Sequence, residues 1–273
     1  MVPLPVDPFV LALLALAAVV SLVALGYGIA ELRLAVLVLR SRPSAVLETP
    51  GGGPVELRGT AKPVGGVLRS PFTETPCLAY EYVVEEERDS KNGRHWTTVA
   101  SGDEYLPFRL DDGSGSVLIE PPGADFRLAT DARIEVDGGT EPPAPIARFI
   151  DRTEDLDSEN TSIDLRVFEL RTGRDRRFVE RRLEPGETVH VLGTARYDPS
   201  ASSAAGDVNA AVGIDERALS PSRWLRLRHR LFGHPFVIAE GSERWLGLRA
   251  GAVGLASILG GVAALGFVVA VAV

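Results

Sequence analysis

The chain has 273 residues, 45% of them hydrophobic, and a formal net charge of −8. This acidic balance argues against nucleic acid as a partner, because surfaces that bind it are strongly basic. A single cysteine, Cys77, excludes an intrachain disulfide. Lys62 and Lys91 are the only lysines among 29 basic residues, which is typical of a halophilic archaeon, although an arginine-biased genome gives the same count.

Two long apolar segments lie near the two ends of the sequence. Residues 9–30 contain no charged residue, and neither do residues 250–273. A helix needs about 20 apolar residues to cross a bilayer, so both segments are long enough. The first lacks the basic start and the short apolar core of a signal peptide. We therefore expect a cell-membrane protein with uncleaved transmembrane helices at residues 9–30 and 247–273.

The arginines predict an orientation for the part between these helices. Several arginines follow the first apolar segment and precede the second, whereas residues 1–8 carry none. Basic residues flanking a span favour the cytoplasmic side, so the middle of the chain is expected in the cytoplasm. We assign a juxtamembrane linker to residues 31–54 and a basic juxtamembrane segment to residues 223–246. The arginines of this segment either contact anionic lipid or only fix the topology: Arg223, Arg226, Arg228 and Arg230.

Residues 55–222 read as a series of strands and turns. Alternating or β-branched runs predict strands, and Asn92-Gly93 is a hairpin signal between two of them. We expect one mainly β domain, a barrel or a sandwich, between the two transmembrane helices. The predicted strands are residues 55–61, 77–86, 96–100, 105–110, 117–120, 126–128, 133–136, 165–170, 178–183 and 188–195.

Four other segments lead to specific expectations. Residues 56–62 and 190–196 both end in Gly-Thr-Ala plus a basic residue, which indicates either two related halves of the domain or a chance identity. Residues 138–162 are rich in loop-forming residues, with a helical turn predicted at 146–150. Residues 200–206 contain mostly Ser, Ala and Gly, and we expect them to be flexible.

The sequence shows little sign of catalytic chemistry. It has no Gly-x-Ser-x-Gly elbow, and no cysteine pair to complete a zinc site with its four histidines. Cys77 with His95 would imitate a thiol–imidazole pair, but a lone cysteine opening a strand is more often buried. Asp111-Asp112-Gly113 is primarily a turn signal, with a cation site as the other interpretation. Glu85-Glu86-Glu87 is expected to be solvated. We predict no catalytic residue, metal or cofactor.

Seven short motifs follow one another in a fixed order along the chain. They are Gly59-Thr60-Ala61, Leu-Arg-Ser-Pro at 68–71, Cys-Leu-Ala-Tyr-Glu-Tyr at 77–82, Trp96, Phe-Arg-Leu-Asp-Asp-Gly at 108–113, Gly-Ser-Val-Leu-Ile at 115–119 and the segment 183–193. This string resembles the GIDE domain, also called the beside-a-membrane domain, of the mitochondrial MULAN-type E3 ubiquitin ligases. The two flanking apolar segments match the layout of that family.

The resemblance implies a binding or sensing role at a membrane rather than catalysis. The family ligases add a RING, which needs about eight Cys and His ligands, whereas this sequence has one cysteine and four histidines. The expected role is an interaction or scaffold protein whose partners are membrane lipid and membrane-associated proteins. A substrate-recruiting component of a ubiquitin-like ligation system and a membrane-quality or protease-associated factor are the alternatives. Candidate interaction positions are Ser70, Pro71, Cys77, Tyr80, Tyr82 and Gly193, which turn geometry and strand packing would equally explain.

Overall fold

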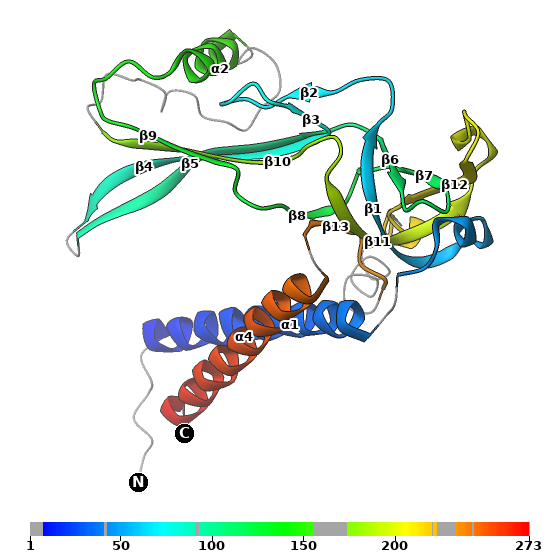
Figure 1. Ribbon diagram of the computed structural model, residues 1–273. Coiled ribbons are helices and arrows are strands. Elements are labelled where there is room, and N and C mark those ends of the chain that lie inside the picture. The colour runs from blue at the N-terminus through cyan, green and yellow to red at the C-terminus, as the bar shows by residue number, and fades with distance from the viewer. Residues whose placement is uncertain are drawn as a thin grey trace. The chain divides into compact units, whose positions relative to one another are not determined.

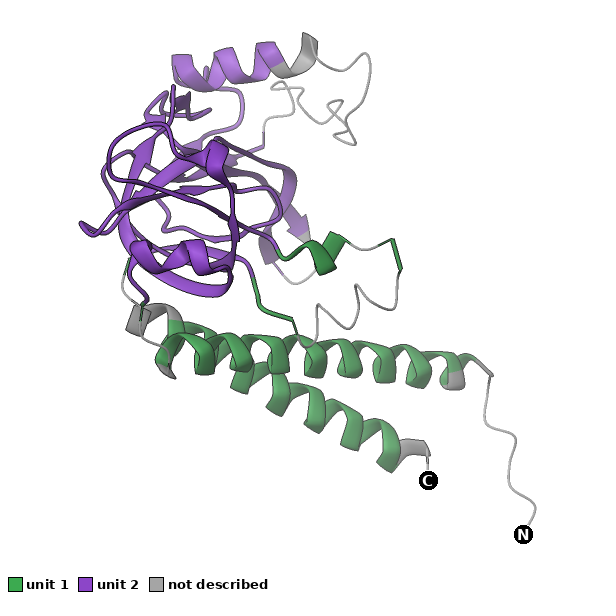
Figure 2. Ribbon diagram, turned by 90° about the vertical axis from the view of Figure 1, so that its right-hand side faces the viewer, with its two compact units in different colours: residues 1–43, 215–235, 241–273 green, residues 44–214, 236–240 purple. Residues whose placement is uncertain are grey.

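The structure is a computed structural model, and it describes residues 8–40, 43–90, 93–155, 174–219, 221–222, 233–241 and 243–272. The chain divides into two compact units (Figure 2). Residues 44–214 and 236–240 form a β unit, and residues 1–43, 215–235 and 241–273 form a second unit that contains the two long helices.

A closed β-barrel forms one half of the β unit (Figure 1). Its strand order is β1-β6-β7-β12-β11, and β11 pairs back with β1 to close the ring. β7 and β12 run parallel, whereas the other neighbours are antiparallel. Five strands in this order make a Greek-key barrel of the OB type. The barrel strands are β1 (Gly53–Pro63), β6 (Phe108–Asp111), β7 (Ser116–Ile119), β11 (Thr188–Tyr197) and β12 (Asp207–Gly213).

Alternating burial explains why these segments form barrel strands. Along β6, Phe108 and Leu110 are fully buried and the residues between them are not. One face of a strand carries every second side chain, so an apolar alternation fills the inside of the barrel. The 3₁₀ helix η1 (Val46–Gly51) adds Val46 to the same core. Two short strands extend the sheet beyond β11: β13 (Val237–Glu240) and β8 (Asp125–Arg127).

A second antiparallel sheet, with strand order β5-β4-β10-β9, forms the other half of the β unit. The helix α2 (Ala144–Asp155) lies over this sheet in Figure 1, and Ile146 and Ile150 share a buried cluster with Val84 and Phe178. The predicted helical turn at 146–150 therefore lies in the N-terminal half of a longer amphipathic helix. The sheet strands are β4 (Ala79–Ser90), β5 (Gly93–Tyr105), β9 (Ala132–Val136) and β10 (Arg176–Leu183), and beside them β2 (Leu68–Arg69) pairs with β3 (Pro76–Cys77).

Several strand boundaries differ from the predicted ones. β5 continues to Tyr105, and β6 begins only at Phe108, so the predicted strand 105–110 is two strands in different sheets. Pro107 lies between them and has no N–H to donate to a ladder, which favours a break there. β13 lies within residues 223–246, for which the sequence predicts a basic juxtamembrane segment. The predicted strand 165–170 and the arginines at 223–230 lie outside the described residues.

The segment 200–206 has ordered contacts, contrary to our prediction. Asp198 caps the 3₁₀ helix η4 (Pro199–Ala201) by accepting a hydrogen bond from the Ser200 backbone N–H. The Asp207 carboxylate accepts the backbone N–H groups of Ser203 and Ala204 at 2.9 and 2.8 Å. The reason is that Ser, Ala and Gly leave the backbone free to form a tight turn around a carboxylate from outside the segment.

The other unit contains two long helices, α1 (Pro8–Arg40) and α4 (Glu243–Ala272). Each contains a segment long and apolar enough to cross a membrane, Ala12–Leu39 and Gly247–Ala270. The helices pack closely where glycines meet, since a Cβ at Gly254 would lie 2.8 Å from the Gly28 carbonyl oxygen. Small residues allow such close approach between helices in membranes. The first segment is longer than the uncharged run 9–30 and includes Glu31, which is buried.

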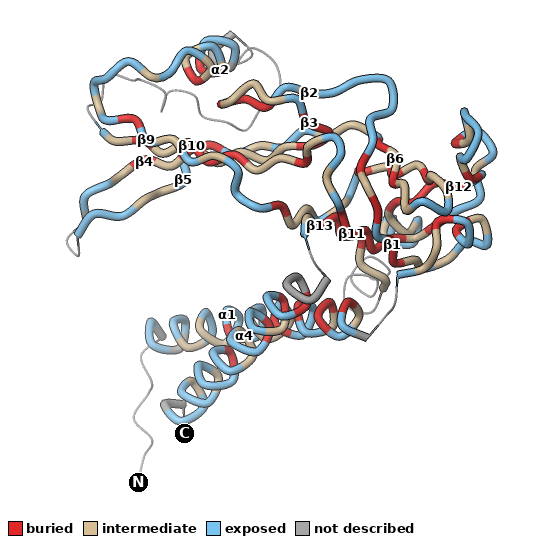
Figure 3. The backbone as a smooth tube through the Cα atoms, viewed as in Figure 1, coloured by how far each residue is buried: buried red, intermediate tan, exposed pale blue. Residues whose placement is uncertain are grey.

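The observed architecture confirms the expected fold class, a mainly β domain with a barrel and two apolar helices near the chain ends. Figure 3 shows many buried residues along the barrel strands and in the second sheet. The two Gly-Thr-Ala segments are barrel neighbours, because Glu56 pairs with Leu192 and Arg58 pairs with His190.

Candidate functional site

The motif residues singled out in the sequence gather around the β2–β3 hairpin and β4, with one exception. Ser70 and Pro71 begin the turn between β2 and β3, and Cys77 ends β3. Tyr80 and Tyr82 follow in β4. Gly193 lies apart from them in β11 of the barrel.

The turn that Ser70 begins is held by a buried carboxylate from β10. Glu180 is fully buried and accepts the backbone N–H of Phe72 at 2.8 Å. Its other oxygen accepts the Thr73 hydroxyl at 2.7 Å. Ser70 and Thr75 complete the turn through the Ser70 Oγ, which accepts the Thr75 backbone N–H. A carboxylate with several donors fixes a loop firmly, because leaving it unpaired in the interior is costly.

Arg182 supplies the countercharge to this carboxylate. Its guanidinium lies 2.8 Å from Glu180 and 2.8 Å from Glu184. Burial by itself raises the pKa of Glu180, but the hydrogen bonds from Thr73, Arg182 and Phe72 outweigh it, so the pKa lies below its ordinary value. Glu180 is therefore an ionised structural anchor, and its lone pairs face the turn and the guanidinium.

Phe72 inserts the same turn into an aromatic cluster. Its ring makes edge-to-face contacts with Tyr82, Phe149 and Phe178 at centroid distances of 5.6, 5.2 and 5.2 Å. Such geometry adds about 0.5–1.5 kcal/mol per pair beyond the area buried. Tyr82 thus packs the turn and helix α2 onto the second sheet. Tyr80 instead donates its hydroxyl to Glu104 at 2.6 Å, and burial with this bond raises the pKa of Tyr80.

Cys77 is buried, and its environment opposes a nucleophilic role. Burial and the nearby Glu180 carboxylate raise the pKa of the thiol to about 12. A reactive cysteine needs the opposite, a lowered pKa and partial exposure. His95 lies near the exposed end of the β4–β5 hairpin, opposite Arg88. Within the described ranges, no group of three His, Cys, Asp or Glu side chains is placed to hold a metal ion.

Both glycines of the repeated Gly-Thr-Ala motif serve barrel packing. A Cβ at Gly59 would lie 2.5 Å from the Asp111 carbonyl oxygen. A Cβ at Gly193 would lie 2.8 Å from the Val212 side chain and 3.1 Å from Phe236. Contacts this short leave no room for a larger residue. Packing is therefore the role that the structure shows for Gly193.

The Glu85-Glu86-Glu87 run is not uniformly solvated. Glu86 is buried and pairs with Arg174 at 2.8 Å and Arg176 at 3.4 Å. Burial raises the pKa of Glu86, but the hydrogen bonds from these two arginines lower it by more. Glu85 pairs with Arg177 on the other face of the sheet, where Arg177 also stacks over Trp96. The alternation of a strand places neighbouring acids on opposite faces, so one of them enters the interior.

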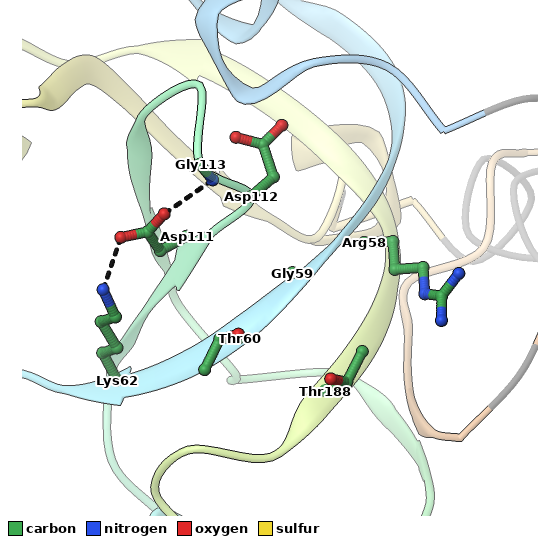
Figure 4. A pocket seen from close by; sticks show the side chains of 8 residues that line it. All are labelled: Arg58, Gly59, Thr60, Lys62, Asp111, Asp112, Gly113 and Thr188. Atoms are coloured by element: carbon green, nitrogen blue, oxygen red, sulfur yellow. Dashed lines mark hydrogen bonds and ion pairs between the residues drawn. The ribbon is translucent and has the colours of Figure 1, made fainter.

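An open polar hollow of about 340 Å³ lies on the barrel where β1 changes its partner from β11 to β6 (Figure 4). Asp111 takes part in an ion pair with Lys62 at 2.6 Å and accepts the Gly113 backbone N–H at 2.8 Å. Asp112 accepts the backbone N–H groups of Val46 and Ser114. The Asp-Asp-Gly segment is thus the predicted turn, and both carboxylates organise it. The hollow is lined by Arg58, Gly59, Thr60, Lys62, Asp111, Asp112, Gly113 and Thr188.

Sequence reasoning missed the residues that organise the turn, Glu180 and Arg182. One signal was available, because Phe178 and Glu180 are two positions apart on a predicted strand and must share its buried face. A charged residue on such a face needs a polar partner, and the Ser/Thr-rich turn 70–75 offered one.

The fold and these contacts define a β protein whose barrel and second sheet are built from one continuous stretch of chain, together with two helices able to span a membrane. A family model described as GIDE, E3 ubiquitin ligase, matches residues 80–204. Residues 80–204 therefore carry the GIDE domain that the motif string predicted. The searches of curated proteins and of solved structures give no match.

Proposed function

We propose that this chain is a membrane-anchored interaction or scaffold protein, related to the non-catalytic part of membrane E3 ubiquitin ligases. The observation that carries the proposal is the GIDE match over residues 80–204. It includes most of the second sheet and three of the five barrel strands, whereas β1, β12 and the 70–75 turn lie outside it.

The contacts around Glu180 support a binding role for the β unit. They fix the 70–75 turn and the aromatic cluster in one arrangement, and a rigid scaffold presents its surface to a partner at little entropic cost. Cys77 is buried. The carboxylates of Glu180 and Asp111 form ion pairs with Arg182 and Lys62, respectively. The proposed partners are proteins at the membrane and the membrane lipid itself.

We further propose that the β unit lies on the cytoplasmic side of the cell membrane, which rests on the arginine-rich flanks of the apolar segments. Cys77 is unsuited to report the side because it is buried. A Ser101→Cys variant places an exposed thiol on β5. We expect a membrane-impermeant maleimide to label this variant only after the cells are permeabilised. Labelling of intact cells would contradict the orientation.

The interaction role is tested by capturing the tagged full chain from native membranes, crosslinked before extraction and kept at native salt. The control is a chain in which residues 44–240 are replaced by an unrelated soluble domain while both helices are kept. We expect recurrent partners with the full chain that the control does not recover. Equal recovery by both chains, or no recurrent partner, would contradict the proposal.

The identity of the partners distinguishes the proposed role from its alternatives. A ubiquitin-charging enzyme or a RING protein among them would favour substrate recruitment for a ligation system, in line with the description of the matched family. A membrane protease would favour the membrane-quality role. Other membrane proteins, recovered through the β unit alone, would favour a scaffold.

A further inference from the structure

The hollow on the barrel has a specific pattern of engaged and unengaged hydrogen-bonding groups. Both of its carboxylates already have donors from the protein. Asp111 is bound by Lys62 and the Gly113 N–H, at 2.6 and 2.8 Å. Asp112 accepts three bonds with one oxygen, from Ser114 N, Ser114 Oγ and Gly115 N, and a fourth from Val46 N with the other. Few acceptor sites of the two carboxylates therefore remain for a ligand.

The hydrogen-bond donors of the hollow, in contrast, are mostly without partners in the described part of the chain. Arg58 and the hydroxyl groups of Thr60 and Thr188 have no hydrogen-bond or ion-pair partner within the described part of the chain. Lys62 uses one of the three N–H groups of its ammonium for Asp111. The hollow therefore offers mainly unused hydrogen-bond donors to a ligand, and two of the side chains that carry them are cationic.

The backbone places these donors together. Arg58, Thr60 and Lys62 are alternate residues of β1 and therefore project from the same face of the strand. Thr188 opens β11 and is the register partner of Thr60. In Figure 4, Arg58 lies on one side of the two threonines, with its guanidinium directed away from them, and Lys62 lies on the other, so the exposed Arg58 side chain must turn to reach a ligand at the threonines. Gly59 permits this arrangement, because a side chain there would collide with the Asp111 carbonyl and displace the turn.

We propose that this hollow binds a phosphate-type oxyanion, held by the Arg58 guanidinium, the Lys62 ammonium and the hydroxyl groups of Thr60 and Thr188. Charge-assisted hydrogen bonds to oxyanions are stronger than neutral ones, and a guanidinium matches a phosphate in geometry. The oxyanion comes either from the headgroup of an anionic lipid or from a soluble phosphate ester. The open hollow of about 340 Å³ is larger than a phosphate group and leaves room for the rest of an ester or a headgroup. The site does not depend on the proposed protein partners, and a lipid headgroup bound here would give the proposed contact with membrane lipid a specific place.

The test uses the full chain in nanodiscs of phosphatidylcholine, titrated with inorganic phosphate against chloride at equal ionic strength by calorimetry. We expect saturable binding, which Arg58→Ala weakens about tenfold, as the loss of one charge-assisted bond does. Thr188→Val should weaken it as well. The matched control is Arg133→Ala, which removes an exposed arginine from β9, away from the hollow. Arg58 is also exposed, so its variant should keep the wild-type thermal unfolding midpoint.

A second titration, in nanodiscs that contain phosphatidic acid, distinguishes the two sources of the oxyanion. Weaker apparent phosphate binding in these nanodiscs, with the difference lost in Arg58→Ala, identifies a lipid headgroup as the ligand. Equal binding in both nanodiscs identifies a soluble phosphate ester. The proposal is overturned if phosphate does not bind saturably, or if Arg58→Ala binds it as well as Arg133→Ala does.

Discussion

Glu180 accepts the backbone N–H of Phe72 at 2.8 Å across a separation of 108 positions in the sequence. This bond joins β10 of the second sheet to the turn between β2 and β3, and it fixes where the Phe72 ring enters the aromatic cluster. The carboxylate is ionised in the folded chain because Arg182 and Thr73 also bind it. The stability of the β unit should therefore depend on this one charge.

Glu180→Gln should destabilise the β unit by about 2–4 kcal/mol. The amide keeps the shape of the side chain but leaves Arg182 with a weaker partner in the interior, and breaking one member of a buried pair is costly. The measurement is the thermal unfolding midpoint of the full chain in detergent. Glu184→Gln is the control, because Glu184 is partly exposed and should change stability by less than about 1 kcal/mol. Equal effects of the two variants would contradict the anchoring role.

Acid should weaken the wild-type chain more than the Glu180→Gln variant. The pKa of Glu180 lies below its ordinary value of 4.5, so near that pH the unfolded chain binds more protons than the folded one. Stability from this group is present above 4.5 and is lost as the pH falls through the lower folded pKa. Unfolding midpoints measured across this range should fall less steeply in the variant. Identical slopes would show that Glu180 does not titrate with folding.

Gly59→Ala should destabilise the barrel by about 1–3 kcal/mol. The added methyl group would overlap the Asp111 carbonyl and push β1 away from the turn that begins at Asp111. Gly66→Ala is the matched control, since no atom lies within 4 Å of the position of its Cβ. The control should stay within about 0.5 kcal/mol of the wild type. Thermal unfolding of both variants measures the difference, and a neutral Gly59→Ala would refute the close approach of the two strands.

The helices α1 and α4 should be joined by a disulfide in the double variant Ala35→Cys, Gly251→Cys. A Cβ at Gly251 would lie 3.6 Å from the Ala35 Cβ, which suits the geometry of a disulfide. The measurement is electrophoretic mobility after protease cleavage within the β unit. The fragments that carry α1 and α4 should migrate as one species without reductant and as two species with it. The pair Ala35→Cys, Gly260→Cys is the control, because nothing lies within 4 Å of Gly260, and it should stay reduced. Crosslinking of both pairs would indicate a different helix packing.

Native Cys77 should react with maleimide only when the chain unfolds. The thiol is buried and its pKa is raised to about 12, so the thiolate is scarce at neutral pH and is shielded from the reagent. The Ser101→Cys variant gives the comparison, because one exposed thiol should label quickly while Cys77 stays unlabelled until denaturant is added. Two rapidly labelled thiols in the folded variant would contradict the burial of Cys77.

Much of the fold could be predicted from local patterns. Apolar length identified the two helices, and the alternation of apolar residues identified most strands of the barrel, as at Phe108 and Leu110. The ordered motif string identified the GIDE domain that the family model also matches. The prediction failed where the local pattern is ambiguous, as at Pro107, where one predicted strand is divided between two sheets.

These local patterns were enough to predict which segments form strands or helices and which domain family they resemble. Which strands pair follows only from the fold, and this pairing places Glu180 against the 70–75 turn and Thr60 opposite Thr188 in the hollow. The physical reason is that periodicity specifies which face of a strand is buried but not which distant strand covers it. A charged residue on a buried face acquires its role only when the chain brings a partner to it, and the partner of Glu180 comes from 108 positions away.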